Sequence, residues 1–517
     1  MVTRHSAALR RRMRQRPHLL PFPWERQGQA RQNKKIPLMT LPTAARINKK
    51  RVGLIFALIP ASTLGGTIKK LYFSKSGKVE TSEVLPMMPE AAKSFHLPAK
   101  LLLPPFFLSA LAFWFCSGCS SPEYSADVVY PFRPDLIVDE APKQNQERLH
   151  GPGQMDKSIA RLGELGGKTL DPKLLPAILR EELDQALGKY FGTPGAPRVG
   201  QSGQKEIASL VKAMNLEGAA LREGSLLYRR NCLHCHGLSG DGRGTTGPWV
   251  NPHPRDFRQG KFKFISSSPT GNKNKPRRED LLRSLRQGIE GTSMPSFNLL
   301  GEKAMEEVTS YVLHLSLRGE IEFEAIRGLL KNKNKVSELF EIIPDAEPEK
   351  ETLDEFVKHY LADLLRAYQK ADQKALEPAP YPKYSDEEFA ESIRRGYHLF
   401  SSAASDAFGC VSCHQDFGRQ PLYQYDEWGT LVRPSNLTMS VYRGGRRPID
   451  LYWRIKRGIP PSKMPAVTAP ADEEGKKIWD MVNFIEALPF PGMLPEEIRM
   501  RVYSRAVRGI AVNSKNK

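Results

Sequence analysis

The sequence Cys-Leu-His-Cys-His at residues 232–236 recurs as Cys-Val-Ser-Cys-His at residues 410–414. These two pentapeptides contain four of the six cysteines in the chain. Each is followed by a Met-Pro pair, with Met294 58 residues after His236 and Met464 50 residues after His414. Because the same parts recur in the same order, chance is a poor explanation for either copy.

The pattern Cys-x-x-Cys-His is the attachment signature of c-type haem. Two residues between the cysteines let both thiols reach the two vinyl groups of one porphyrin, and the histidine then lies under the iron. We therefore expect two covalent haem c groups, one held by Cys232 and Cys235 and one by Cys410 and Cys413. Disulfides are the competing use of cysteine in an exported protein, but the two motifs leave no cysteine of their own for long-range bridges.

The expected axial ligands of the two irons are His236 with Met294 and His414 with Met464. A lone methionine more often fills a gap in a core, but here each Met-Pro follows the same turn, basic-x-Gly-Ile, at 286–289 and 456–459. A thioether is a soft, neutral ligand that favours ferrous iron and raises the reduction potential. Protein ligands on both faces of an iron suit electron transfer rather than oxygen activation.

A proline lies in a corresponding place in each copy, Pro254 18 residues after the first histidine and Pro434 20 residues after the second. Its carbonyl is expected to accept a hydrogen bond from the proximal imidazole and to fix the ring orientation. Candidates for contacts with the haem propionates, with an ordinary solvated or core role equally open, are Arg443, Arg446, Arg447, Trp249 and Trp453. A structural or surface role is expected for His234, His314 and His398.

Each copy also has a helix before the cysteines and a helix at its end. Gly224 with Tyr228, and Gly396 with Phe400, are one helical turn apart, so a second helix can approach each glycine closely and pack on the aromatic ring. Apolar spacing predicts helices at 172–191, 302–317, 353–375 and 472–488. The helix at 353–375 could pack on the rest of the chain or bind a partner, and we favour packing.

These parts together resemble class I c-type cytochromes over 216–319, the first module, and over 385–490, the second module. The resemblance implies two all-α domains, each wrapped around one covalently bound haem. It covers neither the N-terminal extension nor the linker. The pair is similar to the exported, membrane-tethered dihaem cytochromes that accompany bacterial quinol-oxidising complexes and terminal oxidases.

The formal charge of +20 at first suggests nucleic acid or an anionic membrane surface as a partner. Residues 1–118, however, hold 20 Lys and Arg against 4 Asp and Glu, so the rest of the chain carries only +4. The basic excess belongs to the N-terminal leader, and we expect no nucleic-acid binding. Translation is expected to start near Met88, with residues 1–87 outside the working protein.

Residues 88–118 are typical of a signal peptide, with an apolar run at 101–115. Ser117-Gly118 directly before Cys119 resembles a bacterial lipobox, so we expect cleavage there and lipidation of Cys119. The alternative is an N-terminal membrane anchor that stays uncleaved. Either reading exports the chain to the periplasmic side and tethers it to the membrane.

The leading functional hypothesis is an electron carrier without catalytic residues. It would relay electrons in a bacterial respiratory chain, from a quinol-oxidising complex or dehydrogenase to a terminal oxidase, with redox proteins in the membrane as partners. The alternative is a dihaem enzyme of the peroxidase or thiosulfate-oxidising type, which needs an open face at one iron or a nearby nucleophile. The expected order is an extension (119–215), the first module (216–319), a charged helical linker (320–384), the second module (385–490) and a basic tail (491–517).

Overall fold

The computed structural model describes residues 70–73, 79–82, 127–141, 162–164, 166–269, 273–467 and 471–513. The chain divides into two units, residues 1–108 and residues 109–517. In the first unit, strand β1 (Lys70–Phe73) pairs antiparallel with β2 (Val79–Ser82). Apart from this hairpin, the leader lies outside the described residues, and so do the signal peptide and Cys119. The expectations for these segments stay predictions.

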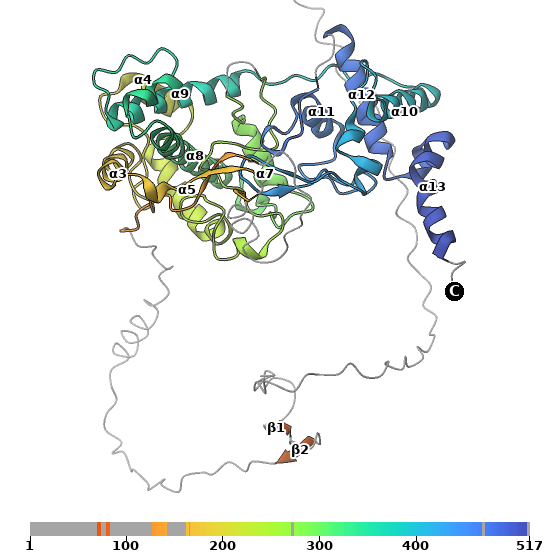
Figure 1. Cartoon of the computed structure of the whole chain (residues 1–517), viewed down its shortest axis with the longest axis horizontal. Coiled ribbons are helices and arrows are strands. Elements are labelled where there is room, and N and C mark those ends of the chain that lie inside the picture. The colour runs from red at the N-terminus through yellow and green to blue at the C-terminus, as the bar shows by residue number, and fades with distance from the viewer. Residues whose placement is uncertain are drawn as a thin grey trace, which may run out of the picture. The chain divides into compact units, whose positions relative to one another are not determined.

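The described part of the second unit is mostly α-helical, as the sequence predicts (Figure 1). Its short strands form two antiparallel pairs, β3 (Ile137–Glu140) with β4 (Lys168–Leu170) and β5 (Gln424–Tyr425) with β6 (Leu431–Val432). The helices are α3 (Ala177–Phe191), α4 (Lys205–Ala213), α5 (Gly218–Asn231), α6 (Leu233–His236), α7 (Arg278–Gln287), α8 (Glu302–Lys331), α9 (Leu353–Gln373), α10 (Asp386–Ser401), α11 (Pro448–Arg457), α12 (Ala471–Ala487) and α13 (Glu496–Asn513).

In the first module, α5 packs closely on α8. A Cβ atom on Gly224 would lie only 2.1 Å from the carbonyl oxygen of Glu307, so only glycine allows this approach. One turn later, the rings of Tyr228 and Tyr311 have centroids 5.3 Å apart. The predicted glycine-aromatic contact between the two helices is confirmed.

The second module repeats this arrangement with α10 and α12. A Cβ on Gly396 would lie 2.1 Å from the carbonyl oxygen of Asp480. The ring centroids of Phe400 and Phe484 are 5.6 Å apart. Since both the close approach and the ring contact recur at the same offsets, the two modules share one helix-pair geometry.

The N-terminal extension and the linker pack on the first module. Helix α9 contacts α3, α4 and α8, which lie together in Figure 1. Its apolar side chains, among them Phe356, Leu361 and Leu365, are fully buried in the same core as those of α5 and α8. Packing, the favoured role of the helix predicted at 353–375, is therefore what the structure shows.

Helix α8 is longer than the sequence predicts, since it runs on past Leu317 to Lys331. The sequence predicts that the first module ends at residue 319 and that a separate charged helical linker begins at residue 320. In the structure Glu320 is buried, and its carboxylate lies 2.5 Å from the Lys275 amine. A charge pair inside a core is stable when both partners are present and hydrogen-bonded, so the sequence pattern alone is misleading here.

The second module has a separate hydrophobic core, built by α10, α11 and α12. The C-terminal tail contributes to it through Leu494, Ile498 and Val502, the last two at the start of α13. The helix predicted at 172–191 begins only at Ala177, because Pro172–Leu174 form a short 3-10 turn before it.

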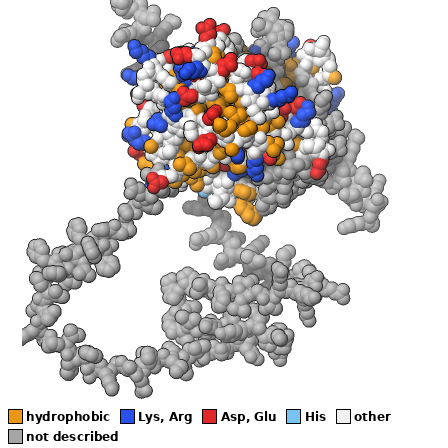
Figure 2. All heavy atoms as spheres, turned by 60° about the vertical axis from the view of Figure 1, so that its left-hand side comes forward, with side chains coloured by type: hydrophobic (Ala, Val, Ile, Leu, Met, Phe, Trp, Pro, Cys, Tyr) orange, Lys and Arg blue, Asp and Glu red, His pale blue; other side chains and the backbone are white. Residues whose placement is uncertain are grey.

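On the face drawn in Figure 2, basic and acidic side chains are interspersed and do not gather by sign. Within the described residues, no helix has the length and apolar character needed to cross a membrane.

Candidate haem sites

The first Cys-x-x-Cys-His motif continues directly from α5 into the short helix α6. The amide of Cys232 donates to the carbonyl of Tyr228 at 2.8 Å, and the amide of His236 donates to the carbonyl of Cys232 at 2.9 Å. In the second motif the amide of His414 donates to the carbonyl of Cys410 at 2.9 Å. One helical turn therefore holds each histidine beside its cysteines, as attachment of one porphyrin requires.

Both proximal histidines are oriented by a backbone carbonyl. His236 donates from Nδ1 to the carbonyl of Arg255 at 3.1 Å. His414 donates from Nδ1 to the carbonyl of Ser435, also at 3.1 Å. This contact fixes the tautomer with Nε2 free to bind a metal. The two sites therefore have the same support for the same ligand atom.

The residues that supply these carbonyls correct the prediction made for Pro254 and Pro434. In each loop the accepting carbonyl belongs to the residue after the proline. The carbonyl of Pro254 instead accepts from Nδ1 of the neighbouring His253 at 3.0 Å. The proline rings still restrict φ in each of these loops, but the prolines do not contact the imidazole through their own carbonyls.

Burial shifts the pKa of the histidine and of a cysteine in each motif. Burial lowers the pKa of His236 to about 4 and also lowers that of His414, so both imidazoles are neutral, the form that binds iron. Burial raises the pKa of Cys232 to about 12 and that of Cys410 to about 11. All four motif cysteines are free of disulfides, and the described residues contain no cluster of three or more His, Cys, Asp or Glu side chains able to hold a metal ion.

Met294 lies in a tightly built loop of the first module. Gly288 at its start has φ of 68°, which glycine adopts without strain. The amide of Ile289 donates to the carbonyl of Met294 at 3.0 Å, and the amide of Phe297 donates to the carbonyl of Leu285 at 2.7 Å. The methionine side chain is partly buried against the core of the first module.

The loop around Met464 has the same glycine and the same two backbone hydrogen bonds at corresponding residues. Gly458 has φ of 66°. The amide of Ile459 donates to the carbonyl of Met464 at 3.0 Å, and the amide of Val467 donates to the carbonyl of Ile455, also at 3.0 Å. Because the offsets are identical, Met294 and Met464 occupy equivalent structural positions.

A cavity of about 590 Å³ opens between this loop and the second motif. Cys410, Cys413, His414 and Met464 all line it. Its volume is typical of cofactor pockets, which are about 300–1,000 Å³. The apolar part of the wall includes Phe400, Leu437, Ile455, Met481 and Ile485. The structure thus brings all five predicted residues of the second site, these four and Pro434, to one cavity. Their side chains and the apolar lining fit a covalently bound haem.

The same cavity has a strongly basic wall. Burial lowers the pKa of Lys263 to about 7 and that of Arg454 to about 10. Cations in such a setting gain from an anionic partner, and the two propionate carboxylates of a haem supply one. The basic side chains that line the cavity are Arg255, Lys263, Arg433, Arg443, Arg454 and Lys463.

The residues that the sequence suggested for propionate contacts fall into two groups in the structure. Arg443 and Trp249 line the cavity. Arg446 donates to the carbonyl of Glu486, and two other candidates have partners of their own: Arg447 binds the carboxylate of Asp450 and Trp453 donates to the carbonyl of Leu376.

The remaining histidines have the structural or surface positions expected of them. His234 and His398 are exposed. His314 is fully buried, and its Nε2 lies 3.0 Å from the hydroxyl of Tyr130. Burial lowers the pKa of His314 to about 3, which keeps it neutral in the core.

A family model described as cytochrome C oxidase, cbb3-type, subunit III matches residues 219–312. These residues form a c-type cytochrome domain. The cytochrome c domain lies within the first module, and its cofactor class is haem c. Among solved structures, the reducing HAO-like protein complex Kustc0457/Kustc0458 of Kuenenia stuttgartiensis contains a chain that is 21% identical, with a match over 52% of this chain and 95% of that chain and a TM-score of 0.36. A likeness at that level carries no argument about function. The comparison with curated proteins gave no match.

Sequence reasoning missed the residues of the first module that border the second site, above all Arg255 and Lys263. Each lies far from residues 385–490 along the chain, and no local motif marks it. The available signal was weak, namely a concentration of arginine and lysine in the loop that follows the first motif.

Proposed function

We propose that this chain binds two covalent haem c groups and transfers electrons through them. The observation that carries the proposal is the duplicated geometry. Each module has the same helix pair, the same carbonyl support for the proximal imidazole and the same hydrogen-bonded methionine loop. Since the first of these lies in a cytochrome c domain, the second is best explained as a further haem domain.

The residues of each site have separate tasks in this proposal. His236 and His414 would hold an iron through neutral imidazole nitrogen, and Met294 and Met464 would hold it through a soft thioether. The apolar walls exclude water, and the basic wall of the second cavity holds the propionates. A bound haem would supply a one-electron couple, which suits electron transfer.

We further propose that the protein serves a bacterial respiratory chain on the periplasmic side of the membrane. It would take electrons from a quinol-oxidising complex or a dehydrogenase and pass them to a terminal oxidase. The resemblance of the paired modules to membrane-tethered dihaem cytochromes supports this role, and lipidated Cys119 or an uncleaved N-terminal anchor would provide the tether.

The number of haems is the first test. The exported protein should gain the mass of two haems, and a pyridine haemochrome assay should give two haem c groups per chain. Replacing Cys410 and Cys413 together by alanine should remove one haem and affect mainly the second module, because the two hydrophobic cores are separate. A gain of one haem, or of none, in the unaltered chain would refute the proposal.

A further inference from the structure

The cavity of the second site is closed on one side by the first module. Residues 248–256, Lys263 and Phe264 line it together with Cys410 and His414 of the second motif. The contact is close, since a Cβ on Gly444 of the second module would lie 2.5 Å from the ring of Phe264. The second site is therefore composed of residues from both modules.

Arg255 in this wall contacts both sites. Its carbonyl accepts the hydrogen bond from His236 of the first site. Its guanidinium carbon lies 3.7 Å from the centre of the Trp428 ring, and both side chains line the cavity of the second site. A guanidinium stacked on an indole at this distance makes a cation–π contact, which is stronger away from water.

The side chain of Arg255 is available to a ligand in the cavity. Its guanidinium lies in the cavity wall beside the Trp428 ring, and a guanidinium carries five N–H donors in a fixed plane. Such a fork matches a carboxylate well. The propionates of a haem in the second cavity supply that chemistry.

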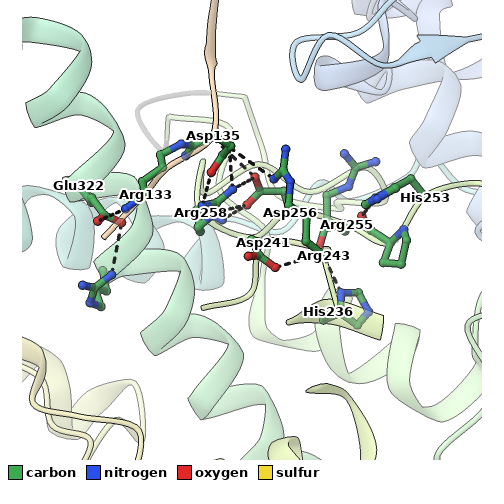
Figure 3. A network of polar contacts seen from close by, with 12 residues as sticks. Arg133, Asp135, His236, Asp241, Arg243, His253, Arg255, Asp256, Arg258 and Glu322 are labelled. Carbon is green, nitrogen blue, oxygen red and sulfur yellow. Dashed lines mark hydrogen bonds and ion pairs between the residues drawn. The ribbon is translucent and has the colours of Figure 1, made fainter. Parts of the chain in front are cut away.

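The backbone at Arg255 is held in place by a buried ionic network (Figure 3). The next residue, Asp256, is bound by Arg258 at 2.8 Å, and Arg258 also binds Asp135 at 2.8 Å. Arg133 lies 3.7 Å from the same carboxylate of Asp256. The network fixes the backbone of the neighbouring Asp256, and the indole of Trp428 fixes the side chain of Arg255. Arg255 therefore has a defined position between the two sites.

We propose that Arg255 is a positioning residue shared by the two haem sites, orienting His236 of the first through its carbonyl and neutralising a propionate of the second through its guanidinium. This inference rests on the proposed function, since it requires a haem in each site. It makes the reduction potential of the second haem depend on a residue of the first module.

The direction of the effect follows from charge. Ferric haem carries one more positive charge than ferrous haem, so a nearby guanidinium favours the ferrous state and raises the potential. Removing that charge should lower the potential of the second haem. Loss of the stacking contact should also loosen the loop whose carbonyl orients His236.

The test uses the full chain with Arg255→Gln, which keeps much of the length and removes the charge. We expect both haems to stay attached by mass and the midpoint potential of the second to fall in a potentiometric titration. The equilibrium for sharing an electron between the haems should shift about tenfold, or about 59 mV for one electron. The low-spin electron paramagnetic resonance signal of the first haem should also change.

Two further variants separate position and charge from general packing. Arg255→Lys keeps the cation without the planar fork, so it should restore most of the potential of the second haem. Arg283 is a matched control, because it also belongs to the first module and its guanidinium lies 4.8 Å from the centre of the ring of a second-module tryptophan, Trp453, outside the cavity wall. Arg283 donates to the carbonyl of Phe264 in the cavity wall but does not line the cavity itself, so Arg283→Gln should lower the potential of the second haem clearly less than Arg255→Gln does.

The outcomes distinguish this inference from the function on which it rests. A chain with fewer than two haems refutes the proposed function. With two haems attached, unchanged potentials in Arg255→Gln overturn the role of Arg255, and so does an equal shift in Arg283→Gln, which would assign the effect to packing between modules. If Arg255→Gln does not accumulate, Arg255→Lys provides the test. Because lysine keeps the positive charge, a fall of about 59 mV in the potential of the second haem in this variant would contradict the charge argument.

Discussion

Met294 and Met464 each end a turn that is closed by a hydrogen bond from an isoleucine amide to the methionine carbonyl at 3.0 Å. A closed turn fixes where the methionine backbone lies, so only a few side-chain rotamers remain to be chosen. In the second module, the wall of one cavity contains both the methionine and the proximal histidine. Such fixed placement is what a metal ligand requires, and a gap-filling methionine has no need of it.

Met464→Ala should open one face of the second iron. The second haem should become high-spin, bind carbon monoxide when reduced and show a lower potential, because a soft ligand that favours the ferrous state is lost. The first haem should keep its low-spin signal, and Met294→Ala should give the converse. The readouts are electron paramagnetic resonance and carbon monoxide difference spectra.

Met439 offers a control for this experiment, because it lies in the same module and its side chain is 57% exposed. Met439→Ala should leave both signals unchanged. Stoichiometric carbon monoxide binding to one haem of the unaltered protein would contradict methionine ligation and favour the enzyme alternative.

The cysteine-histidine motifs and the methionine turns could be located from the sequence because both are local patterns, and iron ligation by their residues stays a prediction. The carbonyls that support the histidines could be predicted only to within one residue. Pro254 marks the right loop, but which carbonyl faces the imidazole depends on how that loop crosses His236, and here it is that of Arg255. Contacts across modules, such as Arg255 with Trp428, leave no pattern in either segment.

Helix pairing in each module depends on one glycine. Gly396→Ala would place a methyl group 2.1 Å from the carbonyl oxygen of Asp480, which is far inside van der Waals contact. The two helices would have to separate, and overpacking of this kind costs about 1–3 kcal/mol or more. We expect the thermal or urea transition of the second module to move to milder conditions.

Gly188 in α3 is the matched control, since a Cβ there would meet no atom within 4 Å. Gly188→Ala should leave stability unchanged or raise it by about 0.5–1 kcal/mol, because alanine is the better helix residue. Equal stability of Gly396→Ala and the unaltered chain would show that the contact between α10 and α12 does not require glycine at residue 396.

The helices at 353–375 and 472–488 could be predicted to within two residues because their apolar stripes are regular. The end of α8 could not. After Leu317 the sequence is rich in charge, yet Arg318 and Glu322 are buried and their charged groups lie 3.3 Å apart. Pairing between buried charges depends on tertiary contacts, so a sequence pattern cannot distinguish it from a solvated surface.

The N-terminal extension is tied to the first module by charge as well as by apolar packing. Asp135 lies 2.8 Å from Arg258 and 3.0 Å from Arg133, and Arg243 is 3.4 Å away. The network continues through Arg133, whose amide donates to the carboxylate of Glu322 in α8 at 3.1 Å (Figure 3). Residues 127–141 thus help to hold the loop that supports His236, although they lie outside the cytochrome c domain.

Asp135→Asn should therefore destabilise the fold by about 3–5 kcal/mol, the usual cost of removing one partner from a buried charge cluster. Burial alone would raise the pKa of Asp135, but Arg258, Arg133 and Arg243 lower it well below its ordinary value. A carboxyl with a lowered folded-state pKa contributes stability that is complete above its unfolded pKa of about 3.9 and is lost as the pH falls toward the folded value. Urea denaturation at several pH values measures both effects.

The exposed ion pair of Asp354 with Lys189 provides a control, since the two side chains are 38% and 49% exposed. Asp354→Asn should cost at most about 1 kcal/mol. Equal losses in the two variants would show that the Asp135 network contributes no more than a surface ion pair.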